Sequence, residues 1–181
     1  MNAKQPLNQQ GREAYSGQIK NFSKERYISA DWFAREWQAV WAKSWIAAVH
    51  VSDLTDPGDY VVFDLGPESI LLTCDGAGTV QAFYNVCQHR GVRLVDDHSG
   101  NTENFRCPYH SWSSDLAGTL RRTPHIGGPG IDTLDSVQHC DYPLINVRTH
   151  VWRDIIFVNL GDNAPDFEIA TATLLDRWRV F

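Results

Sequence analysis

The sequence is poor in several features that mark particular classes of protein. Its 181 residues include four cysteines and one methionine, and lysine does not occur beyond Lys43. No apolar run approaches the roughly 18 residues that a membrane-spanning helix needs. Residues 1–25 also lack the apolar stretch of a secretory signal. We therefore expect a protein of the reducing cytoplasm with no membrane partner.

The charge balance argues against a general nucleic-acid binder. Sixteen Lys and Arg stand against 22 Asp and Glu, a formal net charge of -6, whereas nucleic-acid-binding domains are usually basic. The apolar share of 43% and the charged share of 21% are those of an ordinary globular protein. A chain of this length can bury a core without disulfide bonds.

The chain divides into three parts by pattern. Residues 1–25 are polar and without periodicity, which predicts a flexible N-terminal arm. Residues 26–165 form the expected domain, and residues 166–181 are expected to begin a linker to a missing domain. A helix is predicted to begin after Ser29, a favourable N-cap residue. Its apolar face is expected to pack on a sheet and comprises Phe33, Trp37, Val40, Trp41 and Trp45.

Short runs of β-branched and aromatic residues separated by turn residues occupy the middle of the chain. The runs are 46–51, 60–65, 70–74, 80–86, 104–106, 146–151 and 155–160. This pattern predicts an all-β fold, an antiparallel sandwich or barrel. Two longer segments, 87–103 and 107–141, are predicted to be loops, and loops of that length are usually functional.

Two cysteine–histidine pairs have the spacing of metal ligands. They are Cys87-Gln88-His89 and Cys107-Pro108-Tyr109-His110, with seventeen residues between them. A single structural zinc usually takes Cys–Cys and His–His chelates, so mixed pairs would strain it. A two-iron cluster accepts them, with both thiolates on one iron and both imidazoles on the other. Zinc and a disulfide remain the alternatives.

The motif Cys87-Gln-His89-Arg-Gly91, followed by Cys107-Pro-Tyr-His110-x-Trp112, resembles the Rieske signature. Its flanks, Phe83-Tyr-Asn85 and Asp115-Leu-Ala-Gly118, resemble the N-terminal Rieske domain of ring-hydroxylating oxygenase α subunits. The similarity covers residues 27–165. It implies a Rieske-type antiparallel β-sandwich or barrel with a leading N-terminal helix and a small cluster-binding subdomain at about residues 85–120. It also implies a 2Fe-2S cluster whose ligands are Cys87, His89, Cys107 and His110.

The resemblance carries further expectations about the full-length protein. It implies an O₂-dependent hydroxylating or demethylating oxygenase, and a homotrimer. Electrons would pass from a reductase or ferredoxin to a mononuclear non-haem Fe(II) in the missing C-terminal domain of the same or a neighbouring subunit. This chain alone is expected to transfer electrons and to contain no catalytic residue. None of the five other histidines has the spacing of that iron site; they are His50, His98, His125, His139 and His150.

Two other functions remain open at this stage. The chain could be a free-standing Rieske-type ferredoxin, although such carriers are usually shorter and lack the leading helix. It could also be a zinc-binding interaction module without redox chemistry.

The sequence departs from the family pattern directly after one expected ligand. Ser111 stands where glycine is usual, and Ser114 stands where an aromatic residue is common. Ser111 could crowd the loop, donate a hydrogen bond to a cluster sulfur, or be a tolerated surface residue. The arginines near the ligands, among them Arg90, Arg93 and Arg106, could favour the reduced cluster, form ion pairs or face an acidic partner.

Overall fold

The computed structural model describes residues 22–179, and the chain divides into two compact units, 1–35 and 36–181. The first unit contains α1 (Glu25–Ile28) and the start of α2 (Ala30–Ala39). The N–H of Trp32 donates to Ser29 Oγ at 3.3 Å, which confirms the predicted cap. Most of the predicted N-terminal arm, residues 1–21, lies outside the described residues.

The predicted apolar face of the leading helix is largely not buried. The helix ends at Ala39 and a short 3-10 turn follows at Trp41–Lys43. Trp37 is buried, but Val40 and Trp41 remain 49% and 41% exposed. The expectation of a stripe packed along a sheet is therefore wrong for these two residues. Trp37 instead packs over Gly66, where a Cβ atom would lie 2.5 Å from the Trp37 ring.

Ten short strands in the described part of the second unit form three antiparallel sheets, of order β1-β10-β9, β4-β3-β2-β5 and β6-β7-β8. This confirms the predicted all-β class. The strands are β1 (Ile46–His50), β2 (Asp59–Leu65), β3 (Glu68–Cys74), β4 (Val80–Tyr84), β5 (Ser99–Asn101), β6 (Phe105–Arg106), β7 (Ser113–Ser114), β8 (Leu120–Arg122), β9 (Arg148–Trp152) and β10 (Ile155–Asn159). Further 3-10 turns lie at Val51–Asp53 and His139–Asp141.

Each predicted apolar run contains or overlaps one of these strands. The strands β5, β7 and β8, however, lie inside the segments predicted to be loops, which corrects that prediction. They are two or three residues long and mostly polar, so they carry no alternating pattern that would reveal them. Backbone pairing holds them in place instead: β5 pairs with β2, β7 with β6, and β8 with β7.

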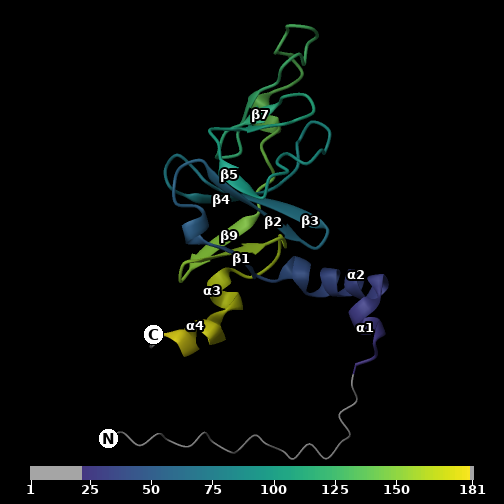
Figure 1. Ribbon diagram of the computed structural model, residues 1–181, viewed down its shortest axis with the longest axis vertical. Helices are drawn as coiled ribbons and strands as arrows, with labels where there is room; N and C mark the ends of the chain where they lie inside the picture. Colours follow the sequence, from purple (N-terminus) through teal and green to yellow (C-terminus); the bar gives the residue numbers. More distant parts are fainter. Residues whose placement is uncertain (1–21, 180–181) are drawn as a thin grey trace, which may run out of the picture. The chain divides into compact units, whose positions relative to one another are not determined.

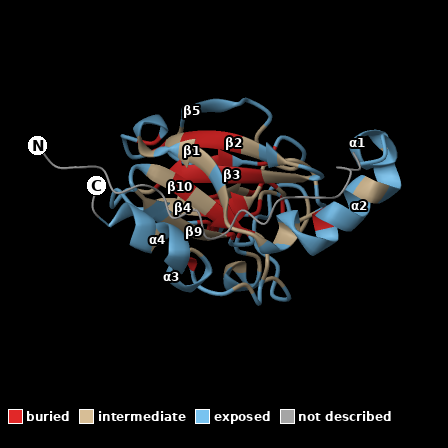
Figure 2. Cartoon of the chain, turned by 90° about the horizontal axis from the view of Figure 1, so that it is seen from below, coloured by how far each residue is buried: buried red, intermediate tan, exposed pale blue. Residues whose placement is uncertain are grey.

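The four-stranded sheet lies in the middle of the second unit; its strands β2, β3 and β4 have buried residues on both faces, whereas β5 is exposed (Figures 1 and 2). Successive residues of a strand point to opposite faces. Ile70 and Leu72 accordingly pack with residues of β10, whereas Leu71 packs with Phe105 and Cys107. One face thus supports the sheet of β1, β10 and β9, and the other supports the lobe that contains both expected ligand loops (Figure 1).

Two hairpins share one turn design. In the β3–β4 turn, Asp75 Oδ1 accepts from the N–H groups of Ala77 and Thr79, both at 2.9 Å. In the β7–β8 turn, Asp115 Oδ1 accepts in the same way from the residues two and four positions on, at 3.1 and 2.8 Å. An aspartate that binds its own turn stabilises the chain reversal. The second turn closes the sheet that contains the second ligand loop.

The segment predicted to begin a linker folds against the first sheet. It contains α3 (Phe167–Ala170) and α4 (Ala172–Trp178). Phe167 is 1% exposed, and its ring stacks on His150 at 4.1 Å and contacts Trp45 and Phe157. The domain boundary at residue 165 stays a prediction. None of the helices between residues 22 and 179 has both the length and the apolar composition of a membrane-spanning segment.

Candidate functional site

The two loops that contain the expected ligands have the same backbone hydrogen bonds. In the first loop, the N–H of Cys87 donates to the carbonyl of Val92 at 2.8 Å, and Gly91 N–H donates back to Cys87 O at 2.9 Å. The second loop repeats both bonds at the same offsets from Cys107, at 2.8 and 3.0 Å. Each loop is therefore a tight turn that begins at a cysteine.

The loops differ in where the histidine lies. His89 is the second residue after Cys87, whereas His110 is the third residue after Cys107. The fourth residue is left-handed in both loops, with φ of +70° at Gly91 and +60° at Ser111. The two loops differ in the position of the histidine and in the residue at the left-handed position. The sequence alone therefore does not reveal that they are structural equivalents.

The two expected thiol ligands lie together in the core. Cys87 and Cys107 are 4% and 1% exposed and belong to the same apolar cluster. Burial raises the pKa of the Cys87 thiol, and the neighbouring Cys107 thiol raises it further. Neither residue is bridged, and the same holds for Cys74 and Cys140. A buried thiol pair of this kind becomes a thiolate pair when a metal replaces its protons.

The two expected imidazole ligands lie edge to face, with ring centroids 4.7 Å apart and an interplanar angle of 69°. His89 stacks on Trp112 at 4.5 Å with an interplanar angle of 7°, and Tyr109 lies 3.8 Å from the His110 ring. Burial lowers the pKa of His89, and the nearby charges of His110 and Arg90 lower it further. The neutral imidazole is therefore favoured, which is the form that binds metal.

Both imidazoles leave a buried nitrogen unsatisfied. The Nδ1 atoms of His89 and His110 are buried without a hydrogen-bond partner among the described residues. Such an atom destabilises a fold unless something binds it. A thiol pair and an imidazole pair on two neighbouring loops are the donor set that a two-iron cluster with mixed ligands takes.

The first ligand loop is braced by an amide in the core. Asn85 Oδ1 accepts from Val95 N–H at 2.9 Å, and Asn85 Nδ2 donates to Val95 O at 2.7 Å. Arg93 adds an ion pair, donating to both carboxylate oxygens of Asp64 at 3.1 and 3.3 Å. The role of Asn85 was not predicted from the sequence, where its signal is an amide directly after an apolar strand.

The outer edges of the imidazoles border a surface hollow. Its lining includes His89, His110, Arg90, Arg106 and His125. Ligand histidines in such a position are accessible to another protein.

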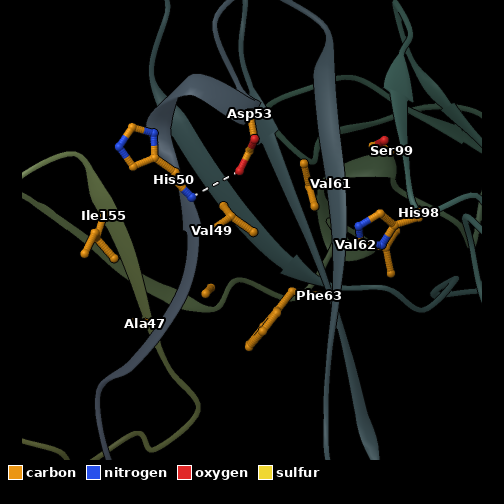
Figure 3. Close-up of a pocket in the computed structure, with 11 residues that line it drawn as sticks. Ala47, Val49, His50, Asp53, Val61, Val62, Phe63, His98, Ser99 and Ile155 are labelled. Atoms are coloured by element: carbon orange, nitrogen blue, oxygen red, sulfur yellow. Dashed lines mark hydrogen bonds between the residues drawn. The ribbon is translucent and has the colours of Figure 1, made fainter.

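A second hollow lies between β1 and β2 and contains none of the expected ligands (Figure 3). Apolar side chains such as Val49, Val61 and Phe63 line it, and His50 and His98 stand at its sides. The N–H of His50 donates to Asp53 at 3.2 Å.

Other histidines also have structural contacts. His139 Nε2 lies 3.1 Å from Thr123 Oγ1, His125 Nδ1 accepts from Gly130 N–H at 2.7 Å, and His150 packs on Phe167. These three histidines therefore contribute to the packing and hydrogen bonding of the fold.

Comparison with known proteins identifies relatives that are oxygenase subunits. The chain is 33% identical over 148 residues to the carnitine monooxygenase oxygenase subunit of Acinetobacter baumannii, covering 81% of this chain and 38% of that protein. It is 28% identical over 142 residues to the benzene 1,2-dioxygenase α subunit of Pseudomonas putida, covering 78% and 31%. The chain thus spans about a third of the length of these relatives.

A solved structure with a similar fold is also an oxygenase. A solved quaternary ammonium Rieske monooxygenase superposes with a TM-score of 0.76 at 29% identity, covering 88% of this chain and 42% of that one. The model of the Rieske [2Fe-2S] domain matches residues 44–140, which include both ligand loops and the strands that carry them. A thiol pair and an imidazole pair on two equivalent turns, within a match that covers more than half of the sequence, place this chain in the Rieske [2Fe-2S] domain family.

Proposed function

We propose that Cys87 and Cys107 bind one iron of a [2Fe-2S] cluster and that His89 and His110 bind the other. The unsatisfied, buried Nδ1 atoms of the two histidines beside the buried thiol pair are the observation that supports this proposal. Two thiolates and two neutral imidazoles are the donor set of a Rieske centre.

The cluster supplies one-electron chemistry when bound, at a higher potential than an all-cysteine cluster because neutral imidazoles add no negative charge. The protein residues keep water from the sulfur side, since both cysteines lie in the core. Trp112 and Tyr109 hold the imidazole rings in place by aromatic contact. The outer imidazole edges at the hollow offer a route for an electron to or from a partner protein.

The proposed role of the chain is electron transfer within an O₂-dependent hydroxylating or demethylating oxygenase. A reductase or ferredoxin would donate single electrons, and a mononuclear non-haem iron outside this chain would receive them. The support is the resemblance of the chain to oxygenase subunits that act on benzene and on carnitine. We extend the proposal to a trimeric full-length protein, in which the electron passes to the catalytic domain of the same or a neighbouring subunit.

Metal content and electron paramagnetic resonance test the ligand set. We expect about two irons and two sulfides per chain, with a histidine-ligated signal after dithionite reduction. Cys107→Ser and His110→Ala should abolish cluster assembly. The matched controls are Cys74→Ser, a buried thiol elsewhere, and His98→Ala, an exposed histidine; both should retain it. Wild-type iron in either ligand variant, or a colourless protein with one zinc, would contradict the assignment.

The electron-transfer role needs a separate test. The reduced chain, mixed with an isolated oxygenase catalytic domain whose mononuclear iron is ferric, should reoxidise faster than in its absence. If the catalytic domain does not accelerate reoxidation and a soluble ferredoxin-type electron acceptor does, the result would instead support a free-standing electron carrier.

A further inference from the structure

One residue of the second ligand loop is not a glycine, although its backbone conformation favours glycine. Both loops need a left-handed residue four positions after the cysteine, and the first loop has Gly91 there. The second loop has Ser111, whose Cβ atom makes a left-handed backbone unfavourable. Strain of this kind persists at functional sites where the surroundings hold it. Ser111 therefore requires a compensating interaction.

The Ser111 hydroxyl has a partner that glycine could not engage. Arg106 Nη2 donates to Ser111 Oγ at 3.0 Å. Arg106 directly precedes Cys107, and Ser111 directly follows His110. The bond therefore joins the two ends of the second ligand loop and fixes the guanidinium beside it.

The charge of Arg106 is not neutralised locally. Arg93 and Arg121 pair with Asp64 and Asp115, at 3.1 and 2.6 Å. Between residues 22 and 179, no carboxylate lies within ion-pair distance of Arg106. Arg106 also lines the hollow that both imidazoles border. A full positive charge is thus held next to the site of the expected cluster.

We propose that Ser111 is a positioning residue that holds the Arg106 guanidinium against the second ligand loop, where its charge favours the reduced state of the bound cluster. This inference rests on the proposed function, because it requires a cluster on the four ligands. Reduction adds one electron, taken from a reductant that loses one electron, and no bond is formed or broken. The fixed positive charge stabilises the added negative charge, so Arg106 raises the reduction potential.

Midpoint potentials of the loaded 181-residue chain test the role of the charge. They can be measured by redox titration followed by circular dichroism, with dithionite as reductant. Arg106→Gln keeps a hydrogen-bond donor and loses the charge. We expect roughly a tenfold shift of the oxidised-to-reduced ratio toward oxidised at a fixed solution potential, about 59 mV for one electron. Arg106→Lys keeps the charge and should recover most of the shift.

Substitutions at Ser111 test the positioning. Ser111→Ala removes the hydroxyl and keeps the Cβ atom, so the freed Arg106 should give a smaller fall in potential. Ser111→Gly should give the same fall, together with a higher melting temperature because the backbone strain is relieved. In both variants the potential should depend more strongly on ionic strength, since a solvated charge is screened more than a held one. A merely structural Ser111 would change the melting temperature and leave the potential unchanged.

Arg122→Gln is the matched control for charge. Arg122 lies on β8, lines a hollow together with Arg106, and makes no hydrogen bond to the ligand loop among the described residues. Equal falls in potential for Arg106→Gln and Arg122→Gln would overturn the proposal in favour of a general charge effect. An unchanged potential in a fully loaded Arg106→Gln would also overturn it.

The readouts separate this inference from the proposed function. A wild-type chain without iron and sulfide would contradict the ligand assignment itself. A loaded wild type with unshifted variants would contradict only the role of Ser111 and Arg106. If Arg106→Gln fails to load, Ser111→Ala decides the question, and a wild-type potential in that variant would overturn the proposal.

Discussion

Aromatic contacts hold the imidazoles of the candidate site, whose Nδ1 atoms make no hydrogen bond within residues 22–179. His89 lies flat on Trp112, which in turn meets Tyr142 edge to face at 5.7 Å. Trp112 is also 4% exposed, so its ring belongs to the core as well as to the site. The orientation of the His89 ring therefore depends on core packing. A substitution at Trp112 should consequently also affect metal binding at the candidate site.

Trp112→Ala is predicted to weaken both fold and site. Removing a buried tryptophan costs about 3–5 kcal/mol of unfolding free energy, and the His89 ring loses the surface on which it stacks. We expect a lower melting temperature and faster loss of iron to a chelator. Trp41→Ala, at a tryptophan that is 41% exposed, is the control and should change neither strongly. Iron retention equal to wild type in Trp112→Ala would contradict the positioning role of the ring.

Local patterns predicted the longer elements well and the shortest ones poorly. β2 and β3 alternate or cluster apolar residues over seven positions each, which is enough to reveal them. Ser113–Ser114 carries no such pattern and forms β7 only because β6 and β8 flank it. The N-cap at Ser29 was predictable because capping is local, whereas the exposure of Trp41 depends on packing and was not.

The two similar hairpin turns differ in what surrounds them. Gly78 and Gly118 occupy the same turn position, with φ of +78° and +81°. A Cβ atom on Gly78 would meet nothing within 4 Å, but one on Gly118 would lie 2.5 Å from the ring of Phe83, which is fully buried. The turn near the ligand loops is thus packed directly on the central sheet.

Alanine at these two glycines should separate backbone strain from close packing. Gly78→Ala should cost about 1 kcal/mol, the penalty for a left-handed residue with a Cβ atom. Gly118→Ala should cost about 1–3 kcal/mol more, because the Phe83 ring has no room to move. Urea unfolding measures both. Equal losses in the two variants would show that the contact with Phe83 is not limiting.

At the scale of the whole molecule, the segment that contains the two C-terminal helices packs on the first sheet. Phe167 inserts among Trp45, His150 and Phe157, residues of three separate segments of the chain. Arg148 supports the segment by donating to Ala164 O at 2.6 Å and to Asp166 at 2.8 Å. We infer that residues 166–178 are part of the folded domain.

Phe167→Ala is predicted to destabilise the domain by about 3–5 kcal/mol, the usual cost of emptying a buried aromatic site. Ile169→Ala, two residues along and 70% exposed, should stay within about 0.5 kcal/mol of wild type. Thermal unfolding of the 181-residue chain measures both. A neutral Phe167→Ala would mean that the segment is a linker that the domain does not need.

The sequence by itself determined the features that depend on residues close together in the chain. The cysteine and histidine spacings, the prediction of a two-iron cluster, the all-β class and the resemblance to Rieske oxygenase subunits all follow from residues that lie near one another in the chain. Their physical basis is local, because chelation, capping and strand alternation act over a few residues.

The tertiary structure alone decided what depends on contacts between distant segments. It paired the two ligand loops as equivalent turns, packed the thiols in the core, and left two imidazole nitrogens without partners in the described part of the chain. It also placed Arg106 on the Ser111 hydroxyl and Phe167 under the first sheet. Backbone handedness and burial are set by the folded surroundings, so no local pattern could have specified them.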